Sequence, residues 1–371
     1  MKIVISGYIG KKITGIGRNL ICLLDNSRSD IEYIVYTNYD MKEDLKFSNP
    51  RVKVKTYNIS KMKSMKNLLW TTFIFPLVVL KEHADEVLIP NFTLLLFKFK
   101  PTVVIMHDLI EFNIPDKFSR IKMFYRTKLA DPITARRANH IITVSNNSKN
   151  DIVHFLRIRE DKISVIYNGV DQEKFSKMQA DKAAMLIKEK NWPEDFILYV
   201  GTIDHPGKNA MGVIKAFEKL RESNDYDGKL VLAGMPGAGY EIISEYIKNS
   251  RYSNEIVITG FVTDDELIAL YSTCNVFCFV SLYEGFGIPP LEALSCGAKV
   301  IVSETSSLPE VVGDVGIKIN PNDVNQLVHA IKKIIKGKWN VSDDDLQNHL
   351  KSYNWKILSD KFEKVLKMSV A

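Results

Sequence analysis

The stretch Ser281-Leu-Tyr-Glu-Gly-Phe-Gly-Ile-Pro-Pro-Leu-Glu-Ala-Leu-Ser-Cys-Gly297 decides how the rest of the chain is interpreted. The apolar run that precedes it, residues 275–280, predicts a buried strand. Two consecutive prolines, Pro289 and Pro290, suit the first turn of a helix, where a missing N–H costs nothing. The stretch therefore predicts a strand, a glycine-rich turn and a helix.

Two carboxylates, Glu284 and Glu292, stand eight residues apart in this stretch. We expect Glu284 in the turn after the strand and Glu292 in the first turn of the helix. Glycines let a backbone approach a ligand closely, and free N–H groups at a helix start bind phosphate. The segment predicted to contact such a ligand is Gly285, Phe286, Gly287 and Ile288. The alternative is a structural turn without a ligand, in which the two acids only stabilise the positive end of the helix dipole.

Length and composition indicate a two-domain protein. A chain of 371 residues is too long for one ordinary core, and 46% apolar with 25% charged residues is typical of a soluble globular protein. The residues Met1–Ser6 enter a strand pattern directly, so we expect no signal peptide. The four cysteines lie in apolar segments without metal-ligand spacing, which predicts reduced core residues of a cytoplasmic protein.

The two halves of the chain carry opposite net charge. Residues 1–185 contain 30 Lys/Arg against 19 Asp/Glu, a net +11, whereas residues 186–371 contain 20 against 25, a net −5. Basic residues are densest between Arg51 and Lys66, just before the apolar run Leu68–Leu80, which is too short to span a bilayer. This pattern predicts either peripheral contact with an anionic membrane or a solvated loop followed by a buried helix. The basic residues are not interleaved with stacking aromatics in a known module, so nucleic acid is not an expected partner.

A glycine-bearing loop follows the first predicted strand. It contains Gly15 and Gly17, ahead of a helix that we expect to begin at Arg18. Strand, glycine loop and helix form a Rossmann-type opening. The third glycine and the distal acid of a dinucleotide-binding fingerprint are missing, which argues against an NAD-dependent oxidoreductase.

Three further polar residues follow predicted strands. His107 and Asp108 come directly after the run 102–106, and Lys208 ends the loop after the run 196–200. Ligands bind at the carboxyl ends of parallel strands, so these side chains are candidates for a site. A lysine there can act as a point charge on phosphate.

The segment from Glu284 to Glu292 resembles, almost residue for residue, the E-x7-E signature of the retaining GT-B glycosyltransferases of family 4. The likeness covers nearly the whole chain and is strongest from about residue 195 to 320. It implies an α/β fold of two Rossmann-like domains that face each other across a cleft, with a C-terminal helix that crosses back to the N-terminal domain. We expect an acceptor-binding domain at 1–170 with helix 355–371, a linker within or near 174–192, and a donor-binding domain at 190–350.

The resemblance also implies roles for individual residues. Glu284 and His107 would contact the donor sugar, with Glu284 stabilising an oxocarbenium-like transition state. Glu292 would bind the ribose hydroxyls, and Asp108 would orient its loop. The other expected donor-binding positions are Gly15, Gly17, Thr202, Lys208, Gly260, Phe261, Val262, Gly285, Phe286, Gly287 and Ile288.

The phosphate-binding loop departs from the family pattern at two positions. Thr202 and Gly207 stand where the family has arginines, and Lys208 is the cation that remains. The first hypothesis is therefore an active enzyme, and the second is a non-catalytic GT-B partner subunit of a glycosyltransferase complex.

The predicted activity is retaining hexosyl transfer from a nucleoside diphosphate sugar, with GDP-mannose as first choice and dTDP- or UDP-sugars as others. The expected acceptor is a hydroxyl of a polyprenyl-diphosphate-linked saccharide in surface polysaccharide synthesis, at the inner face of the cell membrane. Catalysis would depend on charge stabilisation of the leaving diphosphate, and we expect neither a cofactor nor a metal ion. The Asp-x-Asp within Asp343–Asp345 is predicted to cap a helix.

Overall fold

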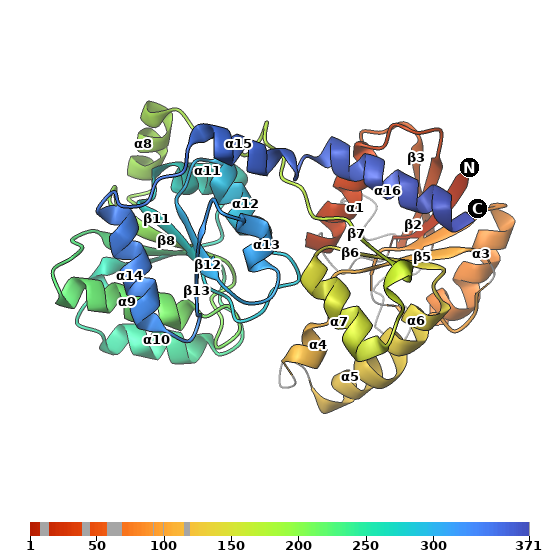
Figure 1. Ribbon diagram of the computed structural model, residues 1–371, viewed down its shortest axis with the longest axis horizontal. Coiled ribbons are helices and arrows are strands. Elements are labelled where there is room, and N and C mark those ends of the chain that lie inside the picture. The colour runs from red at the N-terminus through yellow and green to blue at the C-terminus, as the bar shows by residue number, and fades with distance from the viewer. Residues whose placement is uncertain are drawn as a thin grey trace. The chain divides into compact units, whose positions relative to one another are not determined.

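Aliphatic and β-branched runs form two separate parallel sheets (Figure 1). The computed structural model describes residues 1–7, 15–38, 45–57, 69–91, 93–98, 100–114 and 119–370. The chain divides into two compact units, one made of Met1–Gly169 with Trp355–Ala371 and the other of Val170–Asn354. Each unit is described by itself below.

In its described residues, the first unit forms a seven-stranded sheet of order β3-β2-β1-β4-β5-β6-β7. Its strands are β1 (Lys2–Ser6), β2 (Glu32–Asn38), β3 (Val52–Tyr57), β4 (Glu86–Ile89), β5 (Thr102–Met106), β6 (His140–Thr143) and β7 (Ile163–Val165). Strands β4 and β5 are buried along their whole length, as expected for a parallel sheet covered on both faces. The helices are α1 (Gly15–Asp25), a π-helical turn (Trp70–Ile74), α3 (Phe75–Lys81), α4 (Ile110–Asn113), α5 (Arg120–Phe124), a second π-helical turn (Tyr125–Ala130), α6 (Asp131–Arg137), α7 (Asn146–Leu156), a 3-10 turn (Glu160–Lys162) and α16 (Trp355–Val370).

The second unit forms a six-stranded sheet of order β10-β9-β8-β11-β12-β13 across residues that are all described. Its strands are β8 (Phe196–Val200), β9 (Lys229–Ala233), β10 (Ile256–Gly260), β11 (Val276–Phe279), β12 (Val300–Ser303) and β13 (Ile317–Ile319). The helices are α8 (Ala180–Glu189), α9 (Ala210–Glu222), α10 (Tyr240–Asn249), a 3-10 turn (Ser253–Glu255), α11 (Asp264–Thr273), α12 (Ile288–Ser295), α13 (Leu308–Val312), α14 (Val324–Ile335) and α15 (Asp343–Lys351). The Asp343–Asp345 segment lies in the first turn of α15, where Ser342 is the N-cap.

The C-terminal helix α16 belongs to the first unit, as the family resemblance implies. Its apolar stripe, which includes Leu358, Phe362 and Leu366, enters the same core as Leu20 and Leu24 of α1. Polar contacts add to this packing, since the Glu363 carboxylate accepts hydrogen bonds from the Ser27 hydroxyl at 2.5 Å and the Arg28 N–H at 2.7 Å. The last helix of the chain thus completes the core of the first unit.

Two expected helix positions are wrong. Helix α1 already includes Gly15 and Gly17, so it does not begin at Arg18 as expected. Glu292 lies in the second turn of α12, because Gly287 is the N-cap and the helix starts at Ile288. These shifts arise because a helix start depends on the backbone angles of its cap, which composition alone does not fix.

The expected linker around 174–192 is part of the second unit. Helix α8 buries Ala183 and Ile187, and it packs on α11. Lys190 forms an ion pair with Glu266 of α11 at 2.5 Å. The segment is therefore a helix packed on the second unit and not a free linker.

The basic stretch ahead of α3 is only partly described, because Lys61, Lys63 and Lys66 lie outside the described residues. Within the described ranges, no helix is both long enough and apolar enough to cross a membrane.

Candidate functional site

The candidate site of the second unit lies where its strand order reverses. Strand β8 pairs with β9 on one side and with β11 on the other, and the chain crosses between these two directions. Ligands bind at the carboxyl ends of strands at such a switch point, where the following loops diverge. The loop after β8 ends at Lys208, and the loop after β11 contains Glu284.

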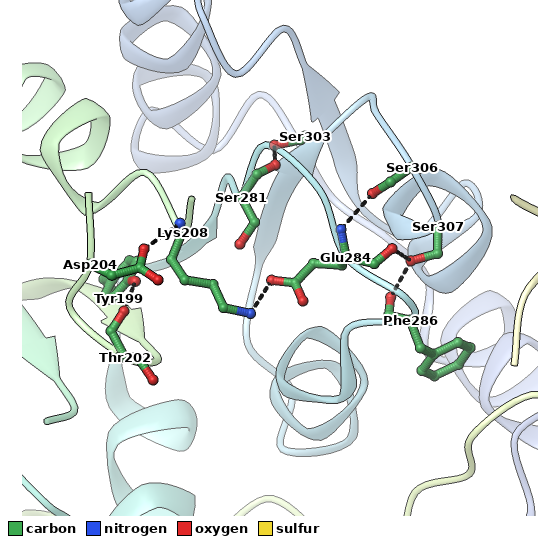
Figure 2. Close-up of polar contacts among 10 residues, drawn as sticks. All are labelled: Tyr199, Thr202, Asp204, Lys208, Ser281, Glu284, Phe286, Ser303, Ser306 and Ser307. Atoms are coloured by element: carbon green, nitrogen blue, oxygen red, sulfur yellow. Dashed lines mark hydrogen bonds and ion pairs between the residues drawn. The ribbon is translucent and has the colours of Figure 1, made fainter. Parts of the chain in front are cut away.

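Lys208 and Glu284 form an ion pair across the switch point, with Lys208 Nζ 2.5 Å from Glu284 Oε1 (Figure 2). Lys208 also lies over the Phe279 ring, with Nζ 5.8 Å from its centroid. The backbone N–H of Lys208 donates to Asp204 Oδ1 at 2.6 Å, which closes the loop on itself. The structure thus places a partly exposed cation and a carboxylate side by side at the expected ligand position.

The two loops are joined by their backbones as well. The N–H of Leu282 donates to the Gly207 carbonyl at 2.9 Å. Asn209, the N-cap of α9, accepts from the Gly212 N–H and donates to the carbonyls of Val280 and Pro321. The relative position of Lys208 and Glu284 is therefore fixed by hydrogen bonds on either side of the ion pair.

A group of serines after β12 positions the Glu284 turn (Figure 2). Ser306 Oγ accepts from the Glu284 N–H at 3.0 Å. Ser307 Oγ contacts two carbonyls, that of Glu284 at 2.9 Å and that of Phe286 at 2.8 Å. A third serine, Ser303, is the last residue of β12 and donates to the Ser281 carbonyl at 2.6 Å, ahead of the turn and outside it. The contacts of these serines with the turn were not predicted from the sequence, because only the β11–β12 pairing brings them together.

The turn that leads into α12 requires a glycine at position 287. Gly287 has a φ of +100°, and a Cβ there would lie 2.6 Å from the Leu308 side chain. Pro289 and Pro290 occupy the first turn, as predicted, and have no N–H. The N–H of Ile288 is therefore the first-turn donor of the helix, and first-turn donors lack an intrahelical acceptor. Gly285 and Phe286 form the turn that leads to this point.

Glu292 is buried, with 7% of its surface exposed. It lies near Tyr271 of α11, whose pKa is raised well above its ordinary value by burial and further by the negative charge of Glu292. A buried carboxylate next to a hydroxyl is a suitable partner for other hydroxyl groups.

Three glycines lie at the carboxyl ends of the neighbouring strands β8, β9 and β10. A Cβ on Gly234 would lie 1.8 Å from the Gly201 carbonyl oxygen, so these two backbones are in direct contact. Gly260 forms a bridge to Gly234, and a Cβ on Gly260 would meet no atom of the described residues within 4 Å. After it, Phe261 is 77% exposed and Val262 is half-buried. Sequence reasoning singled out Gly260 but missed Gly234, although a glycine directly after a strand is the same signal.

The candidate residues of the first unit lie beside its own switch point, between β1 and β4. His107 is buried after β5, and its Nε2 lies 3.2 Å from the Pro90 carbonyl that follows β4. Burial lowers the pKa of His107, which keeps the ring neutral near pH 7. Asp108 accepts from the Ile110 N–H at 3.1 Å and so stabilises the loop. Gly15 is exposed and Gly17 is buried at the start of α1.

Comparison with known proteins gives the same family along both units. The model for Glycosyltransferase Family 4 matches residues 26–174, and the model for Glycosyl transferases group 1 matches residues 182–357. The chain belongs to glycosyltransferase family 4. This family is a retaining one, and its members use nucleotide sugars as donors.

Relatives of this family 4 glycosyltransferase include bacterial mannosyltransferases. It is 32% identical over 247 residues to the serotype-specific mannosyltransferase WbdA of Escherichia coli, which covers 63% of this chain and 29% of WbdA. It is 28% identical over 332 residues to the O-antigen chain mannosyltransferase RfbU of Salmonella typhimurium, covering 88% of each. The chain thus spans less than a third of the length of WbdA and most of RfbU.

The fold agrees with that of a solved glycosyltransferase structure. Anabaena HepE in complex with UDP and glucose superposes with a TM-score of 0.74 at 18% identity, over 99% of this chain and 100% of HepE. The two Rossmann-like sheets are therefore those of the GT-B fold, as predicted.

The structure locates the departure from the family pattern. Thr202 is exposed, and its carbonyl accepts from the Tyr199 hydroxyl at 2.8 Å. A Cβ on Gly207 would lie 3.5 Å from the Asp204 carboxylate, which is ordinary contact. Both positions border the loop that carries Lys208. Among the described residues, no group of three His, Cys, Asp or Glu side chains could hold a metal ion.

Proposed function

We propose that this family 4 glycosyltransferase is a retaining hexosyltransferase whose donor site is the switch point of the second unit. The observation that carries the proposal is the Lys208–Glu284 ion pair beside the start of α12. A diphosphate needs cations and N–H donors, and a sugar needs a carboxylate that accepts from its hydroxyls. Lys208, the Ile288 N–H and Glu284 supply these groups.

The reaction is the exchange of one bond at the anomeric carbon. The bond from that carbon to the diphosphate oxygen breaks, a bond to the acceptor oxygen forms on the same face, and the acceptor proton passes to the leaving diphosphate. The main requirement is stabilisation of separating charge. Lys208 would leave Glu284 to contact the diphosphate, and the freed Glu284 carboxylate would face the positively charged sugar. Neither a metal ion nor another cofactor is part of this scheme.

The remaining predicted contacts complete the donor site. Glu292 would bind the ribose, and Gly260, Phe261 and Val262 would contact the nucleobase through their backbone. From the first unit, His107 would contact the sugar as a neutral imidazole, and the N–H groups of Gly15 and Gly17 would face the donor phosphates. Thr202 would contribute a hydroxyl where the family has an arginine.

We propose mannose from GDP-mannose as the sugar, supported by the names of the relatives WbdA and RfbU. The proposed acceptor is a hydroxyl of a lipid-linked saccharide in O-antigen-like surface polysaccharide synthesis, at the cytoplasmic face of the membrane. The first unit, which carries the positive charge of the chain, would bind this acceptor.

The test is thermal unfolding with a panel of nucleotides and nucleotide sugars, on the wild type and on Glu292→Gln. A ligand at about 100 times its Kd adds about 2.7 kcal/mol to the stability of the folded state, or about 5–10 °C in a unit of this size. We expect GDP and GDP-mannose to raise the Tm of the wild type and to raise that of the variant less. No shift with any nucleotide at millimolar concentration would contradict the proposal.

The departures at Thr202 and Gly207 favour one alternative, a partner subunit that binds sugar nucleotides without turnover. Transfer assays with the stabilising donor decide between the two. For the enzyme, we expect transfer of labelled sugar to a lipid-linked acceptor. The product should keep the anomeric configuration of the donor, and transfer should continue in the presence of EDTA. For the partner subunit, we expect the donor to bind without any transfer of sugar, even after total membrane extract is added to supply acceptors.

A further inference from the structure

The segment Leu69–Leu80 has no charged residue, and its two polar side chains point inward. Thr71 and Thr72 are buried, together with Trp70, Phe75 and Val79. The opposite side of the same helical segment is also apolar, and it is open. Leu69, Phe73, Ile74, Leu77 and Leu80 are each 45–65% exposed. A helix that is apolar all round is normally buried on all sides, so this one lacks a cover in the described structure.

The exposed side chains of this segment continue into a neighbouring one. The Phe97 ring lies 6.4 Å from the Phe73 ring, centroid to centroid, and is itself 49% exposed. Together, the five exposed residues of Leu69–Leu80 and Phe97 form what we call the α3 face. Figure 1 shows α3 at the periphery of the first unit. A contiguous exposed apolar surface of this kind marks an interaction site.

Cations border the α3 face. Lys81 ends α3 and is exposed, and Lys98, next to Phe97, is exposed as well. Lys100 is half-buried and lines a crevice with Phe97 and with Phe75 on the buried side of α3. The apolar residues therefore lie between lysines on both segments.

The positive charge extends from Lys98 to a basic pocket. Leu95, in the same segment as Phe97 and Lys98, donates its N–H to Thr134 Oγ1 at 3.1 Å, and Lys162 Nζ donates to the carbonyl of the adjacent Ala135 at 3.0 Å. Burial lowers the pKa of Lys162, and the charges of Lys98 and Arg159 lower it further. Lys162 is in turn part of a pocket of about 450 Å³ whose charged lining is Arg136, Arg157, Arg159, Asp161 and Lys162. The acid, Asp161, is paired with Arg159 at 2.6 Å. The remaining cations give the pocket a net positive charge.

We propose that the α3 face and the adjacent basic pocket dock the first unit onto an anionic lipid bilayer, with the α3 face among the acyl chains near the headgroups and the pocket on a lipid phosphate. An interfacial helix has this combination of an apolar face and flanking lysines, and it lies in the plane of the membrane. A protein partner would need polar groups on the α3 face for hydrogen bonds, and the face has none among its six residues. The docking deepens the proposed function, because it would bring the enzyme to a lipid-linked acceptor, but it rests on this surface alone.

The test is sedimentation of the full chain with two kinds of vesicle, phosphatidylcholine alone and phosphatidylcholine mixed with phosphatidylglycerol. We expect binding to the mixed vesicles that weakens with salt, because each basic residue near an anionic surface strengthens binding by about fivefold. The variant Phe73→Ser/Leu77→Ser should bind the mixed vesicles at least about tenfold more weakly. Lys98→Glu/Arg157→Glu, at two exposed cations, should lose most of the preference for the anionic lipid while its α3 face is intact.

Matched controls come from the second unit. Met185 and Ile242 are exposed apolar residues there, and Lys299 is an exposed lysine. Met185→Ser/Ile242→Ser and Lys299→Glu should bind vesicles like the wild type. All variants should keep the Tm and the nucleotide-induced shift of the wild type, which separates a loss of docking from misfolding or from a failure of the proposed function.

Three results would overturn the proposal. The wild type could remain in the supernatant with both kinds of vesicle. The controls could lose as much binding as the α3 variants. The wild type could be a dimer in light scattering that Phe73→Ser/Leu77→Ser converts to a monomer without any change in vesicle binding, which would make a second copy of the chain the occupant of the face.

Discussion

At the scale of single residues, the cation at Lys208 decides whether the site can bind a diphosphate. Lys208 is the cation that remains in a loop where the family also has two arginines. A hydrogen bond to a charged group contributes about 1.5–3 kcal/mol. We expect Lys208→Met to weaken nucleoside diphosphate binding about 10- to 100-fold, measured by titration calorimetry, and Lys208→Arg to retain most of the affinity. The exposed Lys299→Met is the matched control. Equal affinity in Lys208→Met and wild type would remove Lys208 from the donor site.

The ion pair itself can be measured separately. In the absence of ligand, Lys208→Met leaves the Glu284 carboxylate without the cation 2.5 Å away. Part of the resulting loss of stability should be restored in Lys208→Met/Glu284→Gln, since the double variant carries neither charge. Additive losses in urea unfolding would show that the two side chains do not interact in solution.

A second residue-scale prediction concerns pH. Glu86 of β4 is fully buried, with Ser369 of α16 as its hydrogen-bond donor, and burial raises the pKa of this carboxyl to about 8. Below about pH 4.5 the folded and unfolded states are both protonated at Glu86. Between that pH and about 8 only the folded state keeps the proton, so stability falls as pH rises, by up to about 1.4 kcal/mol per pH unit.

The variant Glu86→Gln has no such proton to keep. The free energy of unfolding of Glu86→Gln, relative to that of the wild type, should therefore increase from pH 5 towards pH 8. This range lies between the ordinary and the raised pKa of Glu86. Urea unfolding at several pH values measures this. Curves that run parallel for the two proteins would show that Glu86 ionises normally in the folded state.

At the scale of elements, the loop after β12 determines the shape of the Glu284 turn. Ser307→Ala leaves the carbonyls of Glu284 and Phe286 without their hydroxyl donor, at a cost of about 1–3 kcal/mol. We expect transfer activity and donor affinity to fall together, because the turn carries the donor contacts. Ser303→Ala removes a similar bond, to Ser281, outside the turn, and should lower the Tm without changing the affinity. The same affinity loss in both variants would indicate a general loosening of the unit.

The elements also show how far the sequence could predict this site. Pro289 and Pro290 predict the start of α12 because their chemistry is local, and the family signature identifies Glu284 and Glu292. The Lys208–Glu284 pair joins residues 76 positions apart. It depends on β8 and β11 being neighbours, which no local pattern specifies. The sequence also does not predict that the α3 face is exposed, because an apolar helix has the same pattern whether one of its sides or both are buried.

At the scale of the whole molecule, the two units have separate cores, and the C-terminal helix contributes to only one of them. Phe362 of α16 is fully buried in the core that contains β1 and α1. The core of the second unit is built from residues between Ile197 and Ile334. A change in α16 should therefore act on the first unit although α16 follows the second unit in sequence.

Phe362→Ala should destabilise the first unit by about 3–5 kcal/mol, the usual cost of an emptied aromatic site in a core. In calorimetry we expect its transition to move to lower temperature while the transition that nucleotide raises most stays in place, because most of the proposed nucleotide contacts lie in the second unit. Ile357→Ala, on the same helix but 45% exposed, should have little effect. If both transitions moved together by the same amount, the two units would unfold as one cooperative body, and α16 would be the element through which they are coupled.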